Sequence, residues 1–285
     1  MKKITLPLFL LLFLFAFGQD KITISATLVD EYSGKPIEFA NIGFEGRGVG
    51  TVSSERGQFT LSVNPGFAAQ EHELMISCIG YETIRIPHIN WGQLQNVEQR
   101  ISLRPATTEL DPVVILSGKR EYEKLGSETY SLSELGYWMN KDALGGELAT
   151  RVTIDKRRTR LHNFKFHVIR NEADSVKVRI NIYECKGNMP GENLLSKSIY
   201  HTISKNKGVE EISLKEYNVM VDNDIVVGIE MVDSYGEDLY LSVSATPFGG
   251  TAYLRERSMA GWDVRWNFGL AFGMLSSYPA SNSRP

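Results

Sequence analysis

Short segments of alternating apolar and polar residues run through most of this 285-residue chain. "KITISATLVD" (21–30) carries an apolar residue at every second position from Ile22 to Leu28, and "DSVKVRINIYE" (174–184) repeats the pattern with valines and isoleucines. A period of two is typical of strands that turn one face toward a core. Turns with glycine and proline separate the segments, and no helical period appears between residues 21 and 105. The chain is therefore predicted to be all-β.

The spacing of these segments divides the chain into two domains. Strand-like runs within 19–105 predict a small β-sandwich, and a polar stretch with Pro105 and Pro112 predicts a linker over 106–125. Strand patterns resume over 126–277, where roughly eight antiparallel strands predict a second sandwich, most plausibly a jelly roll. "SLSELGYWMNKDALGGELAT" (131–150) fits a short helical segment or a loop that leads into the next sheet, and residues 278–285 are predicted to be a tail.

The first 18 residues have the three parts of a secretory signal peptide. Lys2 and Lys3 precede an apolar run that ends at Phe17, and Ala16 and Gly18 are small residues at the expected cleavage point. The alternative is an uncleaved membrane anchor, but the run is short for a span of roughly 20 residues. We therefore expect an exported protein. It is not expected to be an integral membrane protein after cleavage.

Composition excludes several classes of function. Removal of Lys2 and Lys3 leaves 29 of the 31 basic residues against 34 acidic ones, so no nucleic-acid partner is expected. Two cysteines, Cys78 and Cys185, do not make a disulfide scaffold, and both lie in apolar runs typical of buried thiols. With five histidines and no His-x-x-Glu pattern, no catalytic zinc site, and no other metal or cofactor, is expected.

The first domain resembles the carboxypeptidase regulatory-like family. The resemblance lies in "ISATLVDEYSGKPIEFANIGFEGRGVGTVSSERGQFTLSV" (24–63) and "LMISCIGYETIRI" (74–86). The positions that fit the family pattern are Gly34, Pro36, Asn41, Gly50, Thr51, Gly57, Phe59, Gly80 and Tyr81. The pattern departs at Ser53-Ser54, where the family has Thr-Asp, and at Arg56, where Asp is common.

This resemblance implies a prealbumin-like sandwich without peptidase chemistry. It also implies an exported protein of a Gram-negative bacterium, in the periplasm, at the outer-membrane periphery or at the cell surface. "ELDPVVILSG" (109–118) also resembles the segment that follows such a domain in TonB-dependent transporters. The remaining residues are too few for a plug and a large barrel. The chain therefore resembles stand-alone exported members in which a second sandwich follows the regulatory-like domain.

Aromatic residues of the second domain are the best candidates for ligand binding. Trp138, Tyr253, Arg255 and Trp262 are the predicted binding residues, with Tyr253 and Trp262 preferred because they flank a run of charged residues; Tyr137 and Trp266 have similar surroundings. Exposed aromatics in jelly rolls stack on sugar rings, although aromatics more often fill cores. The oxygen-rich "VDNDIV" (221–226) fits a turn better than a calcium site.

Three functions remain open. We favour a non-enzymatic binding or interaction module of the cell envelope, with a polysaccharide or an envelope protein as its partner. The second is a structural accessory of an outer-membrane transporter that docks through the first domain. The third is a glycan-acting hydrolase with two carboxylates, for which Glu147, Glu230 and Glu237 are available but no pattern pairs them.

Overall fold

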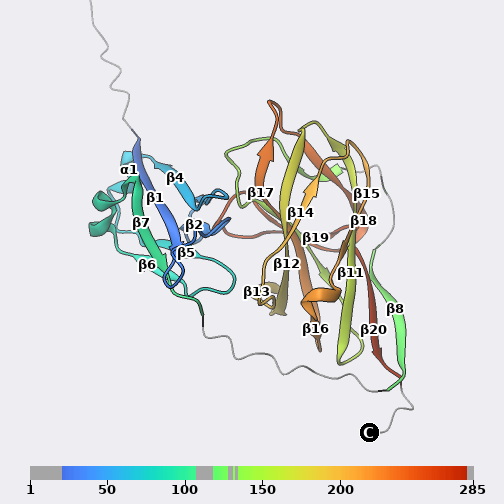
Figure 1. The fold of residues 1–285 in the computed structure, drawn as a ribbon. Coiled ribbons are helices and arrows are strands. Elements are labelled where there is room, and N and C mark those ends of the chain that lie inside the picture. The colour runs from blue at the N-terminus through green and yellow to red at the C-terminus, as the bar shows by residue number, and fades with distance from the viewer. Residues whose placement is uncertain (1–20, 107–117, 128–130, 132–133, 281–285) are drawn as a thin grey trace, which may run out of the picture.

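The structure, a computed structural model, describes residues 21–106, 118–127, 131 and 134–280. Two β-domains lie side by side, the first formed before residue 106 and the second after residue 118 (Figure 1). The prediction of an all-β chain is confirmed. The predicted signal peptide, most of the linker and the last residues of the tail lie outside the described residues.

The first domain is a sandwich of two small sheets. Its strands are β1 (Ile22–Asp30), β2 (Asn41–Phe44), β3 (Val49–Val52), β4 (Gln58–Val63), β5 (Leu74–Ser77), β6 (Ile84–Ile86) and β7 (Gln95–Leu103). The sheet orders are β4-β1-β7 and β3-β2-β5-β6, and only β1 and β7 pair in parallel. A short helix, α1 (Pro65–Ala68), and a 3₁₀ turn, η1 (His88–Gln93), connect strands at one end. Alternate residues of β1 and β4 fill the core between the sheets, as their period predicts.

The second domain contains the strands listed here in chain order: β8 (Arg120–Gly126), β9 (Glu134–Trp138), β10 (Glu147–Val152), β11 (Thr159–Asn171), β12 (Ser175–Lys186), β13 (Met189–Asn193), β14 (Ile199–Ile203), β15 (Gly208–Ser213), β16 (Met220–Val221), β17 (Ile225–Tyr235), β18 (Leu241–Arg255), β19 (Asp263–Leu270) and β20 (Gly273–Pro279). A 3₁₀ turn, η2 (Lys215–Tyr217), precedes β16.

Eight of these strands have the connectivity of a jelly roll. They form the four-stranded sheets β9-β18-β11-β15 and β10-β17-β12-β14. Counted along the chain, the orders are first-eighth-third-sixth and second-seventh-fourth-fifth, which is the order of two interlocked Greek keys. The far half of the long strand β18 also pairs with β10 and so joins the two sheets.

Three boundaries differ from the sequence prediction. β8 begins at Arg120, inside the predicted linker, because its residues pair with β20 at the edge of the sheet. The same pairing carries the domain to Pro279, into the predicted tail. Residues 134–138 form strand β9 rather than a helix or loop, because they pair with β18.

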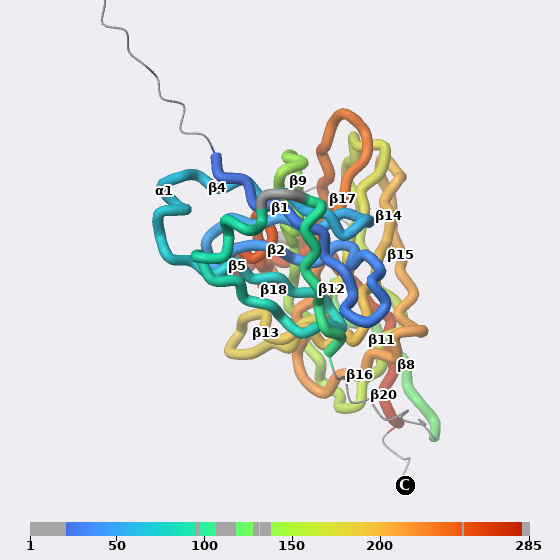
Figure 2. Tube along the Cα trace, turned by 60° about the vertical axis from the view of Figure 1, so that its left-hand side comes forward, coloured from blue at the N-terminus to red at the C-terminus, as the bar shows by residue number. Residues whose placement is uncertain are grey.

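The two domains pack directly against each other. Phe39 of the first domain is 1% exposed and forms an apolar cluster with Val52 and with Val232 of the second domain. Its ring meets the ring of Tyr200 edge-on at 5.2 Å. Seen from the first domain, β2 and β5 lie in front of β12 and β18 (Figure 2). The first domain therefore covers a sheet face of the jelly roll.

Candidate functional site: a buried polar cluster between the domains

The outward face of β12 carries polar side chains that are not in solvent. Val178 and Ile180 point into the jelly-roll core, so Arg179, Asn181 and Tyr183 point to the other side of the sheet. Arg179 is nevertheless only 3% exposed and Asn181 only 2%. The first domain and the loop after β18 cover this face. The alternation of residues in β12 predicts that this face is exposed to solvent, but it is a buried interface.

Two glutamates lie beside these residues on the neighbouring strands. Glu147 of β10 and Glu230 of β17 are register partners, and each is 1% exposed. Gly228, two residues before Glu230, leaves the space that the Glu147 carboxylate occupies: a Cβ there would lie 2.3 Å from Glu147 Oε1. The absence of a side chain at this position lets Glu147 reach across β17 toward β12.

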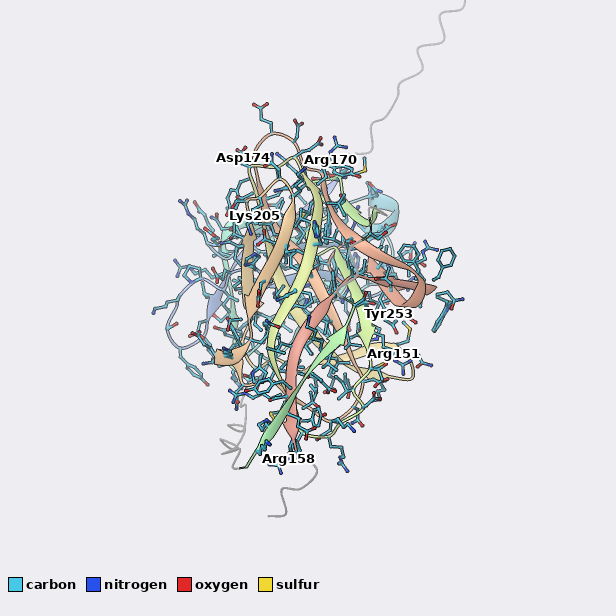
Figure 3. All side chains as sticks on the ribbon, turned by 90° about the vertical axis from the view of Figure 1, so that its right-hand side faces the viewer. Arg151, Arg158, Arg170, Asp174, Lys205 and Tyr253 are labelled. Carbon is cyan, nitrogen blue, oxygen red and sulfur yellow. The ribbon has the colours of Figure 1, made fainter. Side chains whose placement is uncertain are left out.

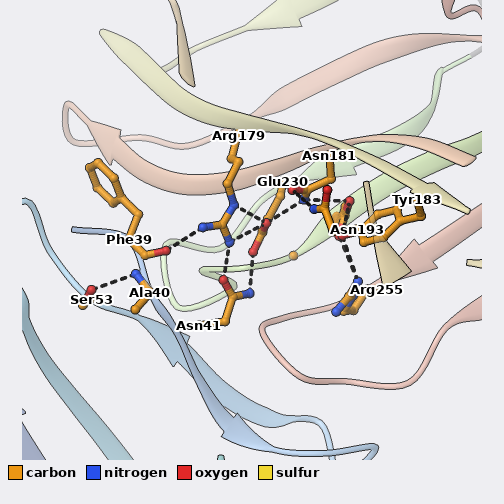
Figure 4. Close-up of polar contacts among 12 residues, drawn as sticks. Phe39, Ala40, Asn41, Ser53, Arg179, Asn181, Tyr183, Asn193, Glu230 and Arg255 are labelled. Atoms are coloured by element: carbon orange, nitrogen blue, oxygen red, sulfur yellow. Dashed lines mark hydrogen bonds and ion pairs between the residues drawn. The ribbon is translucent and has the colours of Figure 1, made fainter. Parts of the chain in front are cut away.

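Arg179 and Glu230 form an ion pair that a residue of the first domain completes (Figure 4). Arg179 donates to Glu230 Oε2 from Nε at 2.9 Å and from Nη2 at 2.7 Å. It also donates to the carbonyl of Phe39 at 2.7 Å and to Asn41 Oδ1. Asn41 in turn donates to Glu230 Oε1 at 2.7 Å. The buried charges are therefore fully partnered only when the domains are docked.

Glu147 has its own set of donors. The Tyr183 hydroxyl donates to both carboxylate oxygens, at 3.0 and 2.9 Å, and Arg255 Nη2 donates to Oε2 at 3.0 Å. Asn181 Nδ2 joins the two carboxylates, since it lies 3.0 Å from Glu147 and 2.8 Å from Glu230. Asn193 of β13 holds Asn181 by donating to its Oδ1 at 3.0 Å.

The surroundings of the two carboxyl groups move their pKa values apart. Burial raises the pKa of Glu147 to about 7, with Glu230 adding to the effect and Arg255 opposing it. Burial also acts to raise the pKa of Glu230, but Arg179, Arg255 and the amides of Asn181 and Asn41 outweigh it and lower that pKa. At neutral pH Glu230 is ionised, whereas Glu147 titrates in this range.

A cavity of about 250 Å³ opens beside this cluster, with walls from both domains. The first domain contributes Asn41, Ser77, Cys78 and Ile79, and the second contributes Arg179, Asn181, Tyr183, Gly191, Asn193, Glu230, Arg255, Met259 and Trp262. The Arg255 guanidinium lies 3.9 Å from the centre of the Trp262 ring. One wall is therefore a fixed arginine–indole pair, and the others are mostly polar.

The structure separates the four predicted binding residues into two groups. Arg255 and Trp262 line the cavity. Trp138 is 4% exposed and donates from Nε1 to the Gly146 carbonyl, so its prediction as an exposed ligand platform was wrong. The same holds for Tyr253 of β18, labelled in Figure 3, which is fully buried and donates to the Asn188 carbonyl. Trp138 packs in the jelly-roll core. Tyr253 packs on the opposite face of the sheet, in a small cluster with Ala149 and Val226. The Tyr137 side chain lies outside the described residues.

The family-pattern residues serve the first domain and its contact with the second. Gly34, Gly57 and Gly80 have positive φ angles in turns, which glycine adopts at little cost. Pro36 bridges to Val29, Phe59 is a core residue, Thr51 lies in β3, and the Tyr81 hydroxyl donates to Asp30. Asn41 and Gly50 contact the second domain instead: a Cβ at Gly50 would lie 2.1 Å from the Ser258 carbonyl oxygen.

The weaker sequence candidates have structural partners. Asp224 pairs with Arg151 and accepts from the Ile154 amide, and Asp222 accepts from the Arg158 amide. Within the described ranges no group of three or more His, Cys, Asp or Glu side chains is placed to hold a metal ion. None of the described helices is long and apolar enough to cross a membrane. Glu237 is exposed, in contrast to the buried Glu147 and Glu230.

A larger groove, of about 900 Å³, lies in the first domain between the start of β1 and η1. Its lining includes Trp91, His72 and His88, and Ile89 at its rim is 86% exposed. It does not include residues of the second domain. This groove and the cavity between the domains are separate surfaces.

Sequence reasoning missed the centre of the site. Arg179, Asn181 and Tyr183 alternate with apolar residues as any solvated strand face does, and Asn193 lies in a turn-like segment. A usable signal was the placement of two glutamates, Glu147 and Glu230, within otherwise apolar strands. A charge in such a run needs a buried partner.

Residues 24–115 match the family described as CarboxypepD_reg-like domain. No curated protein matches the chain at a significant level.

Among solved structures, the chain is similar to the cysteine protease and lectin-like domains of Cwp84, a surface layer associated protein of Clostridium difficile. The identity is 9%, the TM-score 0.37, and the match covers 85% of this chain but only 59% of that one. A structure of infectious bursal disease virus, Gx strain, has 10% identity and a TM-score of 0.31, with 90% and 78% of the two chains covered. Carbohydrate-binding modules from the β-sandwich superfamily have 10% identity and a TM-score of 0.18, with 78% and 94% covered. Similarity at this level transfers no function.

Proposed function

We propose that the chain, whose residues 24–115 match the CarboxypepD_reg-like family, is a non-enzymatic binding module whose two domains build one ligand site. The observation that carries the proposal is the cavity of about 250 Å³ between the domains. Asn41 of the first domain and Trp262 of the second both line it. Ligand sites commonly lie at such domain interfaces, with a few polar groups that fix orientation.

The lining suits a glycan. Trp262 is a half-buried indole, and the amides of Asn41 and Asn193 and the guanidinium of Arg255 lie around it. A sugar ring has apolar C–H faces for an aromatic ring and hydroxyl edges for planar polar groups. The cavity is smaller than the roughly 300–1,000 Å³ of drug-sized sites, so it would hold one ring-sized unit.

A glycan array probed with wild type and with Trp262→Ala tests this function. We expect binding to at least one polysaccharide class by the wild type and a loss of ten-fold or more in the variant. Trp266→Ala is the matched control, because Trp266 is 61% exposed and does not line the cavity. If the wild type binds no glycan, or if the control loses as much as Trp262→Ala, the glycan proposal fails.

The proposed setting is the cell envelope of a Gram-negative bacterium, after export through the predicted signal peptide 1–18. The mass of the protein recovered from the producing cells tests this, because cleavage would leave Gln19 as the first residue. A mass that includes Met1, together with a cytoplasmic fraction, would remove the export proposal and leave the binding site untouched.

One observation favours a glycan-acting hydrolase as a second candidate. Glu147 and Glu230 both lie within 3.0 Å of one Asn181 nitrogen, so they are closer than the upper limit of about 10 Å for glycosidase carboxyl pairs. Their pKa values are also moved apart, as in an acid–base pair.

The hydrogen bonds of the pair favour binding over catalysis. Each of the four carboxylate oxygens accepts from a protein donor, so a substrate would have to compete with these donors for either carboxyl group. Burial raises the pKa of Cys78, which lines the same cavity, so this residue is a thiol and not a nucleophilic thiolate near pH 7. Hydrolysis of a bound glycan by wild type, abolished in Glu147→Gln and in Glu230→Gln, would reverse this preference.

The accessory role at a transporter draws support from the groove of about 900 Å³ in the first domain, with the exposed Ile89 at its rim. Cross-linking in cells from Ile89→Cys would test it. Recovery of an envelope protein supports this role, and recovery of none at a labelled, folded protein counts against it.

A further inference from the structure

We infer that the ligand of the cavity between the domains is an acidic sugar, a pyranose unit that bears a carboxylate, rather than a neutral one. The inference rests on the proposed glycan-binding function and names the class of glycan. It follows from which hydrogen-bonding groups the protein has already used and which it has left for a ligand.

The acceptors of the cluster are occupied. Glu230 accepts from Asn41 at Oε1 and from Arg179 and Asn181 at Oε2. Glu147 accepts from Asn181 and Tyr183 at Oε1, and from Tyr183 and Arg255 at Oε2. Neutral sugars are rich in hydroxyl donors, which pair best with carboxylate acceptors. Each of the four carboxylate oxygens of this site already accepts at least one hydrogen bond from the protein.

Donors remain. Within the described residues, the hydrogen bonds from Arg255 to protein atoms all come from Nη2, and its buried Nε has no partner. Asn193 donates to Asn181 Oδ1, and an amide nitrogen has a second N–H. Arg255 and Asn193 both line the cavity, and each has an N–H group, apart from the buried Nε of Arg255, that no atom of the described residues accepts. A carboxylate is the best acceptor for a guanidinium, since it pairs with two N–H groups at once.

Trp262 and Glu147 prepare Arg255 for this contact. The indole lies over the guanidinium at 3.9 Å, and Glu147 holds Nη2 at 3.0 Å. Two contacts of different kind fix the plane of the guanidinium before a ligand arrives, which lowers the entropy cost of binding. The buried cluster has two guanidinium groups against two carboxyl groups, and protonation of Glu147 leaves it with a positive charge that an anionic ligand would balance.

The test compares acidic monosaccharides with their own methyl esters, which keep the ring and remove the charge. Methyl glycosides of glucuronate, galacturonate and N-acetylneuraminate are titrated into the full mature chain at pH 7, with heat and indole fluorescence as readouts. We expect at least one acid to bind ten-fold or more tightly than its ester. This preference should disappear in Arg255→Gln and persist in part in Arg255→Lys, which keeps the charge.

Arg265→Gln is the matched control, because Arg265 is exposed, pairs with Asp263 and does not line the cavity. Equal binding of acid and ester by the wild type overturns the inference, and this comparison holds even if Arg255→Gln does not fold. Binding of neutral glycans alone on the array refutes the acidic ligand and leaves the proposed function standing. Binding of no glycan removes both.

Discussion

Glu147 gives the chain a pH dependence that can be measured without any ligand. Its pKa is raised to about 7 in the fold from an ordinary 4.5, so between these values the folded chain binds more protons than the unfolded chain. The free energy of unfolding therefore falls as pH rises from about 5 to 8, by roughly 3 kcal/mol from this group. Glu230 acts in the opposite sense, but its stabilisation is lost as pH falls from its ordinary pKa of 4.5 through its lowered pKa, which lies outside this window. Urea denaturation at each pH measures the trend.

The difference between wild type and Glu147→Gln isolates this group. His162 and His167, whose pKa values are lowered by burial, contribute equally to both proteins. Arg255 stays charged, and burial raises the pKa of Tyr183 far above the window. The wild type should lose stability relative to the variant as pH rises, while Glu237→Gln, on the surface, should track the wild type. A difference that is flat from pH 5 to 8 would contradict the assignment.

At the scale of strands, the sequence predicts where a strand lies and which way its side chains point better than it predicts what packs against them. The two-residue period placed β1, β4 and β12 because it reports the pleat of the backbone itself. The sequence did not predict the short strands β8 and β9, since they pair with β20 and β18, which come from distant parts of the chain. A period reports which residues share a face and does not report what covers that face.

The candidate site was predictable to the same limited extent. Arg255 and Trp262 stood out as a charged residue and an aromatic in a glycine-flanked loop. The partner of Glu230 could not be read from sequence, because Asn41 lies in the other domain. Tyr253 was misjudged for the converse reason, since a loop-flanking aromatic can equally end a buried strand.

The β2–β3 hairpin of the first domain should be sensitive to the smallest possible side chain. In Gly50→Ala the new Cβ would lie 2.1 Å from the Ser258 carbonyl oxygen, in the loop after β18, and 2.9 Å from the Ile42 carbonyl oxygen. Both of these oxygens belong to the backbone, which cannot move aside as a flexible side chain can. We expect a loss of about 1–3 kcal/mol in unfolding free energy, measured by the midpoint of urea denaturation.

Gly66→Ala is the control for this variant, because no atom lies within 4 Å of a Cβ at Gly66. Its stability should stay within about 0.5 kcal/mol of the wild type or rise, as for an exposed residue. Equal stability of Gly50→Ala and wild type would mean that the β2–β3 hairpin does not pack against the loop after β18 in solution.

For the whole molecule, the contact between the domains has the features of a permanent interface. Domains joined by a linker move independently unless the interface is large and apolar. Here Phe39 is buried against the second domain, the Gly46 amide donates to the Met259 carbonyl, and Lys177 pairs with Glu55 across the boundary. Separation would also remove Asn41 from the Arg179–Glu230 pair. Each partner lost from a buried polar group costs about 1–3 kcal/mol.

The domains should therefore stay together when the covalent connection is cut. A protease site introduced between residues 107 and 117 would allow cleavage of the folded chain, and we expect both fragments to co-elute from a sizing column at micromolar concentration. Asn41→Ala should weaken this association about 5- to 150-fold, because it leaves Glu230 Oε1 and the Arg179 Nη2 group short of a partner. Glu45→Ala, which breaks the exposed pair with Arg85 inside the first domain, should change it little. Wild-type fragments that separate at once would show that the linker alone holds the domains together, and a ligand site built from both would then lack its fixed wall.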